Sequence, residues 1–562
     1  MLPEIREVNT DPRVRSFVLP TRVMVTQGLV NNGEAMLMRR PFQAHITESV
    51  PTMRLENREG HPPAGILLDF GRELVGGVRL LCVGTAGATN PRLRVRFGES
   101  ASEALTPLGV KGACNDHAIR DMVIPMTAMS DQEWGQTGFR FVYLQLEEPE
   151  AAVTLKGVLA VFVRRDIPMR GSFRCSDPLL EQIYETGAYT CHLCMQALLW
   201  DGVKRDRLVW IGDTHPEMLT IRTAFGYQPV LEESLDFACE VTPLPDWMNT
   251  MPSYSLWWLL ILRDWYTYTG QAAYPLKHKA YIQGLTDQLL GRIRPDGLLE
   301  LPSSFLDWPS CQQPVAVEGV QALAVLSMEA AADLLTLCGD HHRAARVEEA
   351  LPALRRFPAT GEGSKPAVAL LSLAGMLPPE TVRTALLEGG DRGVSTFMSF
   401  YILTALARAA GCAEALGLLR SYYGGMLQMG ATTFWEDFNT AWMERACPID
   451  RIPAEGERDI HGDFGAYCYE KFRHSLCHGW ASGPVPFLME TVLGIAFAVP
   501  GGKEITLCPD LGDLTWAEGV YPLPDGGDLW VRCERTATGV TVEYRAPAGV
   551  TVTVQEAACR KT

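Results

Sequence analysis

The spacing of apolar residues changes twice along this chain. Up to about residue 170, short apolar or alternating runs such as Gly65–Phe70, Val78–Val83 and Leu93–Phe97 are separated by Gly, Pro and Asn. Many short strands of this kind, without helical segments between them, are typical of a β-sandwich. We therefore predict an N-terminal β-sandwich domain over residues 1–170.

From residue 171 the apolar spacing becomes helical. Ser176-Asp-Pro178 offers cap residues and a proline suited to a first helical position, and an apolar face begins at Leu179. Runs of similar spacing recur at 256–270, 318–339 and 401–423. No repeat of fixed period accompanies them, which argues against a solenoid. The pattern predicts one large all-α domain over 171–492, with its helices stacked as pairs.

Strand-like alternation returns at about residue 493. Three runs carry it, namely Leu529–Cys533, Val540–Tyr544 and Val550–Val554. Pro524-Asp-Gly-Gly527 supplies the turn before the first of them. The sequence thus predicts a small C-terminal β domain over 493–562.

The composition of the chain disfavours several classes of binding partner. The chain of 562 residues has a formal net charge of −16 and no long basic run, so nucleic acid and anionic membranes are unfavourable partners. No stretch reads as a membrane span, and the first eight residues hold no apolar signal region. The 15 cysteines lack framework spacing, which favours reduced thiols and a cytoplasmic protein. Cys191-His-Leu-Cys194 lies in a helical pattern without a second Cys/His pair, so we predict buried structural cysteines and no metal site.

The segment Asp201–Asp213, with the sequence DGVKRDRLVWIGD, holds the densest chemistry. It combines three carboxylates, three cationic side chains and a tryptophan with two glycines and β-branched residues, a composition unlike a plain surface helix. Such a segment is either a salt-bridge network or a polar site, and we favour the site. An indole face beside carboxylates suits a sugar, because it offers stacking, hydroxyl partners and acid catalysis together.

Glycoside hydrolysis needs a second carboxyl group from a distant segment. Glu436, in Gly430-Ala-Thr-Thr-Phe-Trp-Glu-Asp-Phe438, is the best candidate, although Thr432 or Thr433 could instead begin a helix with an acidic first turn there. His478 is a third candidate, since Gly479, Trp480 and Gly483 suggest a tight loop; the alternative is a satisfied core histidine. Acid–tryptophan pairs also occur at Asp246-Trp247, Asp264-Trp265 and Asp307-Trp308, of which Asp264-Trp265 lies mid-helix and suggests packing.

These motifs together resemble the α-L-rhamnosidases of glycoside hydrolase family 78. The segment 201–213 looks like the signature of that family. Further stretches resemble it in the same order along the chain: Leu68–Gly71 with Gly76-Gly77, Thr137–Val142, Gly171–Pro178, Gly430–Glu436, Ser475–His478 and Leu514–Gly519. The resemblance implies a multidomain protein in which an all-α (α/α)6-barrel catalytic domain is flanked by β-sandwich domains. It also implies hydrolysis of terminal α-L-rhamnose with inversion of the anomeric carbon.

The resemblance assigns roles residue by residue. Asp206 would be the general acid and Glu436 the general base, while Asp201, Arg205 and Asp213 would hold rhamnose hydroxyls. The remaining positions are the pocket walls Trp210, Trp308 and, as a looser match, Trp257, together with His478 on the base side. The family usually has glutamate where this chain has Asp206, so the acid is shorter by one methylene.

Mechanism sets two further expectations. An inverting pair leaves room for a water molecule, so its carboxyl groups should lie roughly 6.5–9.5 Å apart. Asp206 must either point away from Arg205 and Arg207 or be desolvated to remain protonated. No cofactor and no metal are expected; the partner is a small rhamnosylated glycoside or oligosaccharide, and a homodimer is possible. The alternatives are an (α/α)6-barrel hydrolase for another deoxy- or uronic sugar, or a non-catalytic carbohydrate-binding protein.

Overall fold

The computed structural model describes residues 8–46, 50–311 and 313–555. The sequence-based statement on an N-terminal signal region therefore falls mostly outside the described residues. The chain divides into two compact units. We call Met1–Ile167, His192–Arg207 and Arg445–Cys477 the β unit, and Pro168–Cys191, Leu208–Glu444 and His478–Thr562 the helical unit.

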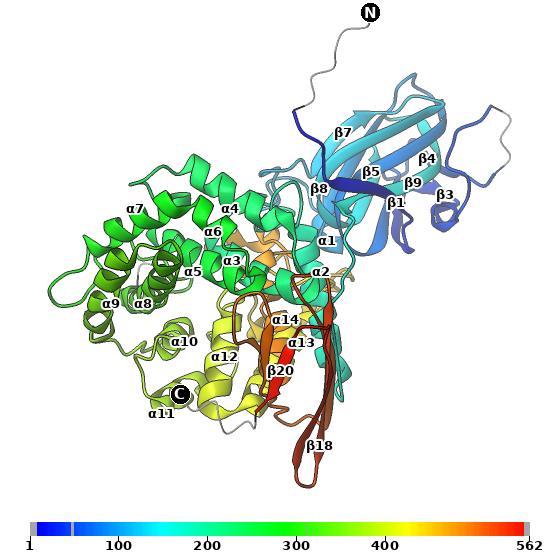
Figure 1. Cartoon of the computed structure of the whole chain (residues 1–562). Coiled ribbons are helices and arrows are strands. Elements are labelled where there is room, and N and C mark those ends of the chain that lie inside the picture. Colours follow the sequence, from blue (N-terminus) through cyan, green and yellow to red (C-terminus); the bar gives the residue numbers. More distant parts are fainter. Residues whose placement is uncertain (1–7, 47–49, 312, 556–562) are drawn as a thin grey trace, which may run out of the picture. The chain divides into compact units, whose positions relative to one another are not determined.

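A nine-stranded antiparallel sheet forms the body of the β unit (Figure 1). Its order is β3-β4-β9-β5-β8-β6-β7, with β1 added on β9 and β2 on β5. The strands are β1 (Arg13–Val18), β2 (Arg22–Gln27), β3 (Leu29–Asn31), β4 (Met53–Glu56), β5 (Gly65–Ala86), β6 (Arg92–Gly98), β7 (Asp121–Pro125), β8 (Ser130–Leu146) and β9 (Ala152–Arg165). A short helix, α1 (Ala101–Leu105), follows β6 and is capped by the Ser100 side chain.

Strand β5 joins two runs that the sequence analysis kept apart. The predicted strands at 65–70 and 78–83 are one strand of 22 residues, and its register shifts between Asp69 and Leu74 and again between Gly76 and Val78. Gly76 has φ +142°, and a Cβ there would lie 1.9 Å from the Val161 carbonyl oxygen. The glycine and the bulges let one strand pair first with β2 and β8 and then with β8 and β9.

The segment 445–477 belongs to the β unit, although the sequence analysis placed it within the helical region. Two small pairings order it: β11 (Ala446–Cys447) with β12 (Arg458–Asp459), and β13 (Gly465–Ala466) with β14 (Tyr469–Glu470). Main-chain hydrogen bonds tie it to the sheet region, from Ala101 N–H to Ile449 O (2.9 Å) and from Phe472 N–H to Lys111 O (3.0 Å).

Helices dominate the helical unit, drawn in green and yellow in Figure 1; the last three residues of the first of them, α2, are counted with the β unit. They are α2 (Pro178–Cys194), α3 (Ile211–Ala224), α4 (Pro229–Val241), α5 (Pro252–Thr269), α6 (Ala273–Lys277), α7 (Lys279–Leu290), α8 (Pro314–Leu337), α9 (His341–Arg355), α10 (Lys365–Leu373), α11 (Pro379–Leu387), α12 (Ser399–Ala410), α13 (Cys412–Gln428) and α14 (Pro484–Phe487). The predicted start at Pro178 and the stop at Gly270, which has φ +67°, are confirmed.

The single helix predicted over 401–423 is wrong. The chain forms α12 and α13 there, separated by Gly411 with φ +103°. The apolar spacing continues across this glycine, which hides the break. A backbone in the left-handed half of the map ends one helix and redirects the next.

Helix α8 shows a second difference. Among the residues that the structure describes, it is the one helix long and apolar enough to cross a membrane by length and composition. The expectation that no stretch reads as a span therefore missed it. However, 72% of its most apolar window is buried inside the protein, and it packs on α5, α9 and α10. Its apolar surface is used in the core of the helical unit.

The C-terminal strands pack within the helical unit. One sheet runs β10-β17-β18-β19, from β10 (Ser172–Cys175) through β17 (Trp516–Pro522), β18 (Asp528–Thr536) and β19 (Gly539–Arg545). A second joins β15 (Ile495–Phe497), β16 (Glu504–Leu507) and β20 (Thr551–Val554). The three strands predicted after residue 528 all form. The domain boundaries at 170 and 493 stay a prediction.

Candidate functional site

The nine candidate residues divide between the two units. Asp201, Arg205 and Asp206 lie in the β unit. The helical unit contains the other six: Trp210, Asp213, Trp257, Trp308, Glu436 and His478. The division falls inside the charged segment, between Arg207 and Leu208. Each group of residues therefore has its own local structure.

In the β unit, the Asp206 carboxylate faces an arginine and a histidine. Its Oδ1 accepts a hydrogen bond from Arg205 Nη1 (3.1 Å) and lies 3.4 Å from His117 Nε2. The side chain is 19% exposed, so it is only partly desolvated. Of the two arrangements that the sequence left open, the first does not hold for Arg205, which contacts Asp206. Arg207 instead donates to Gln136 O (2.9 Å) and stacks on Trp200.

The backbone that carries this carboxylate is strained. Asp206 and Arg207 have φ values of +55° and +58°, two successive non-glycine residues in the left-handed region. Each such residue costs roughly 1–2 kcal/mol relative to a right-handed conformation. A pair of them persists only where the surrounding contacts hold the turn in place.

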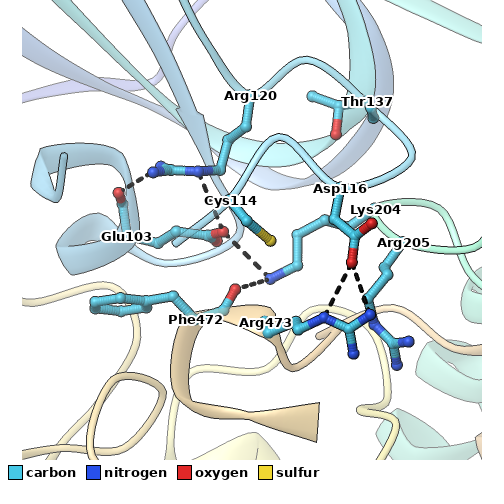
Figure 2. Close-up of a pocket in the computed structure, with 10 residues that line it drawn as sticks. Glu103, Cys114, Asp116, Arg120, Thr137, Lys204, Arg205, Phe472 and Arg473 are labelled. Atoms are coloured by element: carbon cyan, nitrogen blue, oxygen red, sulfur yellow. Dashed lines mark hydrogen bonds and ion pairs between the residues drawn. The ribbon is translucent and has the colours of Figure 1, made fainter. Parts of the chain in front are cut away.

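Lys204 supplies the densest of these contacts. Its buried ammonium lies 3.0 Å from Glu99 Oε2 and 3.2 Å from Glu103 Oε1, and it donates to Phe472 O (2.9 Å). It also donates to His474 O. Figure 2 shows the ammonium between the Glu103 carboxylate and the Phe472 carbonyl.

A small pocket adjoins this ammonium (Figure 2). Its cavity of about 10 Å³ is near the lower limit for one water molecule. Asp116 and Arg473, which form an ion pair of 2.7 Å, line it together with Arg205 and Arg120. A sugar ring does not fit a space of this size. The pocket is therefore a small polar cavity beside the strained turn, and it is not the sugar site.

Burial sets the electrostatics around Lys204. It raises the pKa of Glu99 to about 7, because desolvation and repulsion from Glu103 outweigh the attraction of Lys204. The pKa of Glu73 is raised well above its usual range, first by burial and then by the charges of Glu99 and Glu103. Burial also holds the pKa of His461 well below its usual range, and the charge of Lys204 adds to the effect.

Glu99, Glu103 and His461 have ligand atoms within 4.8 Å of one another, a spacing that a metal ion could use. Lys204 already provides the cation there, since its Nζ lies 3.5 Å from His461 Nε2 as well as against both carboxylates. These residues form a buried ion cluster organised by an ammonium. The sequence analysis included Lys204 in its charged segment but identified none of Glu99, Glu103 and His461 as part of a site.

In the helical unit, Asp213 is the centre of a buried polar group. It lies in the first turn of α3, where its Oδ2 contacts His478 Nε2 (3.0 Å) and its Oδ1 accepts from the Tyr254 hydroxyl (3.4 Å). Burial raises the pKa of Asp213 against the opposing effect of His478, and the charge of Glu436 adds to the rise. The structure therefore brings three predicted residues, Asp213, Glu436 and His478, into one electrostatic group.

The Glu436 segment is not helical. The chain from Ala431 to Asn439 forms bends and coil, so the alternative of a helix N-cap with an acidic first turn is wrong. The Glu436 carbonyl accepts hydrogen bonds from Trp480 Nε1 (3.0 Å) and from the Thr396 hydroxyl. These bonds leave the carboxylate of Glu436 on a backbone that is fixed from two sides.

The neighbouring residues complete this fixation. Phe434 N–H donates to the Thr190 hydroxyl (2.8 Å), and the Phe434 carbonyl accepts from His478 N–H (3.0 Å). Burial raises the pKa of Asp437, the residue after Glu436, to about 7, and the charges of Glu436 and Asp307 add to it. His478 precedes a 3₁₀ turn at Gly479–Ser482, which confirms the tight loop, and it is also a buried and paired histidine.

Aromatic rings connect the predicted walls to these acids. Trp210 contacts Tyr254 (ring centroids 5.9 Å), Tyr254 contacts Phe305 (6.0 Å), and Phe305 contacts Trp308 (5.2 Å). The second path runs from Trp257 through Phe397 (6.2 Å) to Trp480, which stacks on Phe397 at 5.0 Å and lies 4.3 Å from His478. Tyr254 and Phe397 had no local signal in the sequence, since each looks like an ordinary core position.

The second half of the charged segment has its own anchor. Asn249 accepts from Ile211 N–H through Oδ1 (3.0 Å) and donates to Val209 O through Nδ2 (2.9 Å). It does so from a left-handed backbone with φ +51°. The Asn249 side chain thus satisfies both sides of the chain where α3 begins.

Two further residue pairs from the sequence lie in helices of the structure. Cys191 and Cys194 are fully buried in α2, which confirms that they pack. Trp265 is fully buried within α5, which confirms the predicted packing, while the half-buried Asp264 contacts Arg263 and His215.

Part of the chain matches a known protein family. Residues 168–309 match the family described as the bacterial α-L-rhamnosidase six-hairpin glycosidase domain. This match confirms the family resemblance seen in the motifs. None of the curated proteins matches the chain.

Solved structures extend the likeness over most of the chain. The family 78 rhamnosidase of Bacillus sp. GL1 is similar with a TM-score of 0.74 at 22% identity, over 93% of this chain and 55% of that one. A Klebsiella oxytoca rhamnosidase with rhamnose bound is similar with a TM-score of 0.66 at 19% identity, over 85% and 95% of the two chains. The Streptomyces avermitilis α-L-rhamnosidase complexed with L-rhamnose gives 0.66 at 18% identity, over 89% and 49%.

These matches establish the fold as a helical six-hairpin (α/α)6 domain between β-sheet domains. The chain spans about half the length of the Bacillus enzyme. It carries an α-L-rhamnosidase-like glycosidase domain, at low identity to the enzymes of known structure.

Proposed function

We propose that this chain hydrolyses terminal α-L-rhamnose from small rhamnosides, with inversion of the anomeric carbon. The observation that supports this best is the buried group of Asp213, His478 and Glu436 within an aromatic shell. Buried carboxylates beside a histidine and aromatic rings suit hydroxyl binding and general acid–base work. Rhamnose is bound in the Klebsiella and Streptomyces proteins, which share the fold.

In this mechanism Glu436 is the base and Asp206 the acid. Glu436, ionised, takes a proton from a water that attacks the anomeric carbon, while Asp206 protonates the departing glycosidic oxygen. Their carboxyl groups should lie roughly 6.5–9.5 Å apart when substrate is bound. Asp201, Arg205 and Asp213 hold hydroxyl groups, Trp210, Trp257 and Trp308 wall the sugar, and His478 supports the base side.

The shorter acid sets the expected rate. Aspartate reaches about 1.5 Å less far than glutamate, the length of one carbon–carbon bond. A misplacement of about that size costs around a hundredfold in rate when the backbone does not compensate. Asp206→Glu is therefore the informative variant: an increase in kcat on a poor leaving group would show that reach limits the wild-type enzyme.

A screen of aryl α-L-rhamnosides beside other aryl glycosides tests the proposal. We expect turnover of the rhamnoside, loss of that turnover in Glu436→Gln, and the β-anomer of rhamnose as the first product in proton NMR. A first-formed α-anomer would exclude inversion. Turnover confined to another glycoside would favour a hydrolase for a different deoxy- or uronic sugar.

One observation favours a second candidate, a non-catalytic rhamnose-binding protein. Asp206 is paired with Arg205 and faces His117, an arrangement suited to a fixed carboxylate as much as to a proton donor. Calorimetric binding of L-rhamnose without turnover of any aryl rhamnoside would support this function and end the catalytic one.

We also propose a cellular location and an oligomeric state for this enzyme. We place it in the cytoplasm, because its many cysteines, including the buried Cys191 and Cys194, suit a reducing compartment. A homodimer is proposed as well, and sedimentation of the purified chain measures it directly.

A further inference from the structure

We infer that Lys204 is a positioning residue of this enzyme, which holds the strained turn at Asp206 in the orientation that proton donation needs. The inference rests on the proposed function, because it assumes that Asp206 delivers a proton. It concerns the buried ion cluster of Lys204, Glu99, Glu103 and His461, a group of residues outside the sugar-contacting positions described above.

The contacts of Lys204 all lead away from its own segment. Glu99 directly follows β6 and Glu103 belongs to α1, while the carbonyl acceptors come from Phe472 and His474. The chain two residues before Asp206 is therefore held from two separate parts of the β unit. Figure 2 shows Lys204 reaching into the polar cluster, with Arg205 beside it.

The acceptors are themselves fixed. Glu99 Oε2 accepts from Leu476 N–H (2.7 Å), and Glu103 Oε2 accepts from Glu99 N–H (2.8 Å). Arg120 donates to the Glu103 carbonyl (2.8 Å). An ammonium in this cluster thus binds to a rigid frame, and its position sets that of the main chain at 204.

The backbone beyond Lys204 needs such a frame. On its N-terminal side Val203 is tied to the sheet by a hydrogen bond from Gly138 N–H to Val203 O (2.9 Å). On its C-terminal side, Arg207 reaches the Gln136 carbonyl. Between these ties lie two left-handed residues, Asp206 and Arg207, whose conformation relaxes unless it is held.

Charge, as well as shape, makes the anchor specific. A neutral side chain at 204 would leave the buried Glu99 without a facing ammonium and Glu103 with the more distant Arg120 guanidinium (3.9 Å), and the turn would have to move to admit water. An arginine keeps the charge but spreads it over a planar fork, so it restores only part of the geometry. The alternative is that Lys204 merely stabilises the β unit and has no influence on proton donation.

The test compares Lys204→Met and Lys204→Arg with Lys156→Met. Lys156 is another buried lysine of the β unit, which lies on β9 and donates to Gln43 O, so its loss controls for removing a buried ammonium. For each variant, kcat and KM are measured on aryl rhamnosides with good leaving groups and on an alkyl rhamnoside, whose departure needs the acid most. Thermal unfolding is recorded in parallel.

We expect Lys204→Met to lower kcat about a hundredfold on the alkyl rhamnoside and less than about fivefold on the best aryl leaving group, with KM little changed. Lys204→Arg should recover part of the loss, and Lys156→Met should show no dependence on the leaving group. In an Asp206→Asn background Lys204→Met should cost little more, because both changes remove the same step. Equal losses on all leaving groups, or the same pattern in Lys156→Met, would overturn the inference.

A second measurement separates this inference from the proposed function. Hydrogen–deuterium exchange at the amides of residues 205–207 reports the turn itself, whether or not the chain is a hydrolase. We expect faster exchange there in Lys204→Met and no change in Lys156→Met; unchanged exchange overturns the inference. If Lys204→Met does not fold, Glu103→Gln, which removes one charge and keeps the shape, should give the same leaving-group dependence and the same exchange on a smaller scale.

Discussion

The two halves of the charged segment are held by different forces. Residues 201–207 lie in the β unit, where Lys204 fixes the chain through buried ionic contacts with Glu99 and Glu103. Residues 208–213 lie in the helical unit, where Asn249 fixes the chain through two neutral hydrogen bonds. The difference shows that one continuous motif can depend on charge at one end and on amide geometry at the other.

The two candidate catalytic carboxylates also differ in their surroundings. The acid candidate, Asp206, lies beside Arg205 and His117 on a strained and partly exposed turn. The base candidate, Glu436, sits on a backbone fixed by Trp480 and Thr396 within aromatic packing. We therefore expect the acid side to respond to loss of charge and the base side to loss of packing or of a neutral hydrogen bond.

The largest effect should come from the two carboxylates themselves. Glu436→Gln should lower kcat by roughly 10³-fold on every rhamnoside, because the base is needed whatever the leaving group. Asp206→Asn should lower it by a similar factor on an alkyl rhamnoside and far less on an aryl rhamnoside with a good leaving group. Steady-state kinetics on both substrates measure the contrast; an Asp206→Asn enzyme with wild-type turnover of the alkyl rhamnoside would remove Asp206 from the acid role.

Loss of the His478 ring should be the next largest effect. Asp213 is buried against His478 Nε2 at 3.0 Å, so His478→Ala leaves a carboxylate without its partner inside the helical unit. We expect a loss of about 3 kcal/mol in the free energy of unfolding of that unit. Urea denaturation measures it, and Asp213→Asn/His478→Ala should recover part of the loss. A single variant as stable as the wild type would contradict the assigned pairing.

The buried ion cluster of the β unit should make the free energy of unfolding depend on pH. Burial raises the pKa of Glu99 from 4.5 in an unfolded chain to about 7, so the folded state holds this proton more tightly than the unfolded state does. Its contribution to stability is present below pH 4.5 and is lost as pH rises to about 7. Between pH 5 and pH 8 we expect the wild type to lose on the order of 2 kcal/mol relative to Glu99→Gln. Parallel denaturation curves at several pH values test the sign.

The smallest effect on stability should come from Asn249, whose neutral side chain fixes the start of α3. Asn249→Ala removes both hydrogen bonds to the start of α3 and places alanine at φ +51°, so we expect a loss of about 2 kcal/mol. Asn249→Gly also removes the bonds but tolerates the backbone, and should cost about 1 kcal/mol less than alanine. Equal stability of the two variants would show that the left-handed backbone contributes nothing to the difference.

Much of the fold follows from local sequence. Pro178 begins α2 and Gly270 ends α5 as predicted, because caps and helix stops act within a few residues. The split at Gly411 escaped prediction, since the apolar spacing runs on through the glycine. The alternative of an N-cap near Glu436 is wrong for a different reason. Trp480 and Thr396, which are distant from Glu436 in sequence, donate to its carbonyl and fix the segment in a non-helical conformation.

The candidate site divides in the same way. The motif itself singled out Asp213 and Trp210, and Glu436 and His478 stood out beside tryptophan and glycine. Tyr254 and Phe397 could not be found, because a core aromatic and a site aromatic look alike along the chain. The placement of 445–477 in the β unit was equally hidden, since its ties to Ala101 and Lys111 span more than 300 residues.

By itself the sequence determined the order of β and helical regions, the charged motif at 201–213 and the family it resembles. Those properties depend on periodicity, capping and residue identity, which are local. Only the tertiary structure decided that the motif is shared between two units, that Asp206 faces Arg205 and His117, and that Lys204 is surrounded by buried carboxylates. Burial and long-range pairing set these features, because desolvation makes each charge depend on whichever distant residue lies against it.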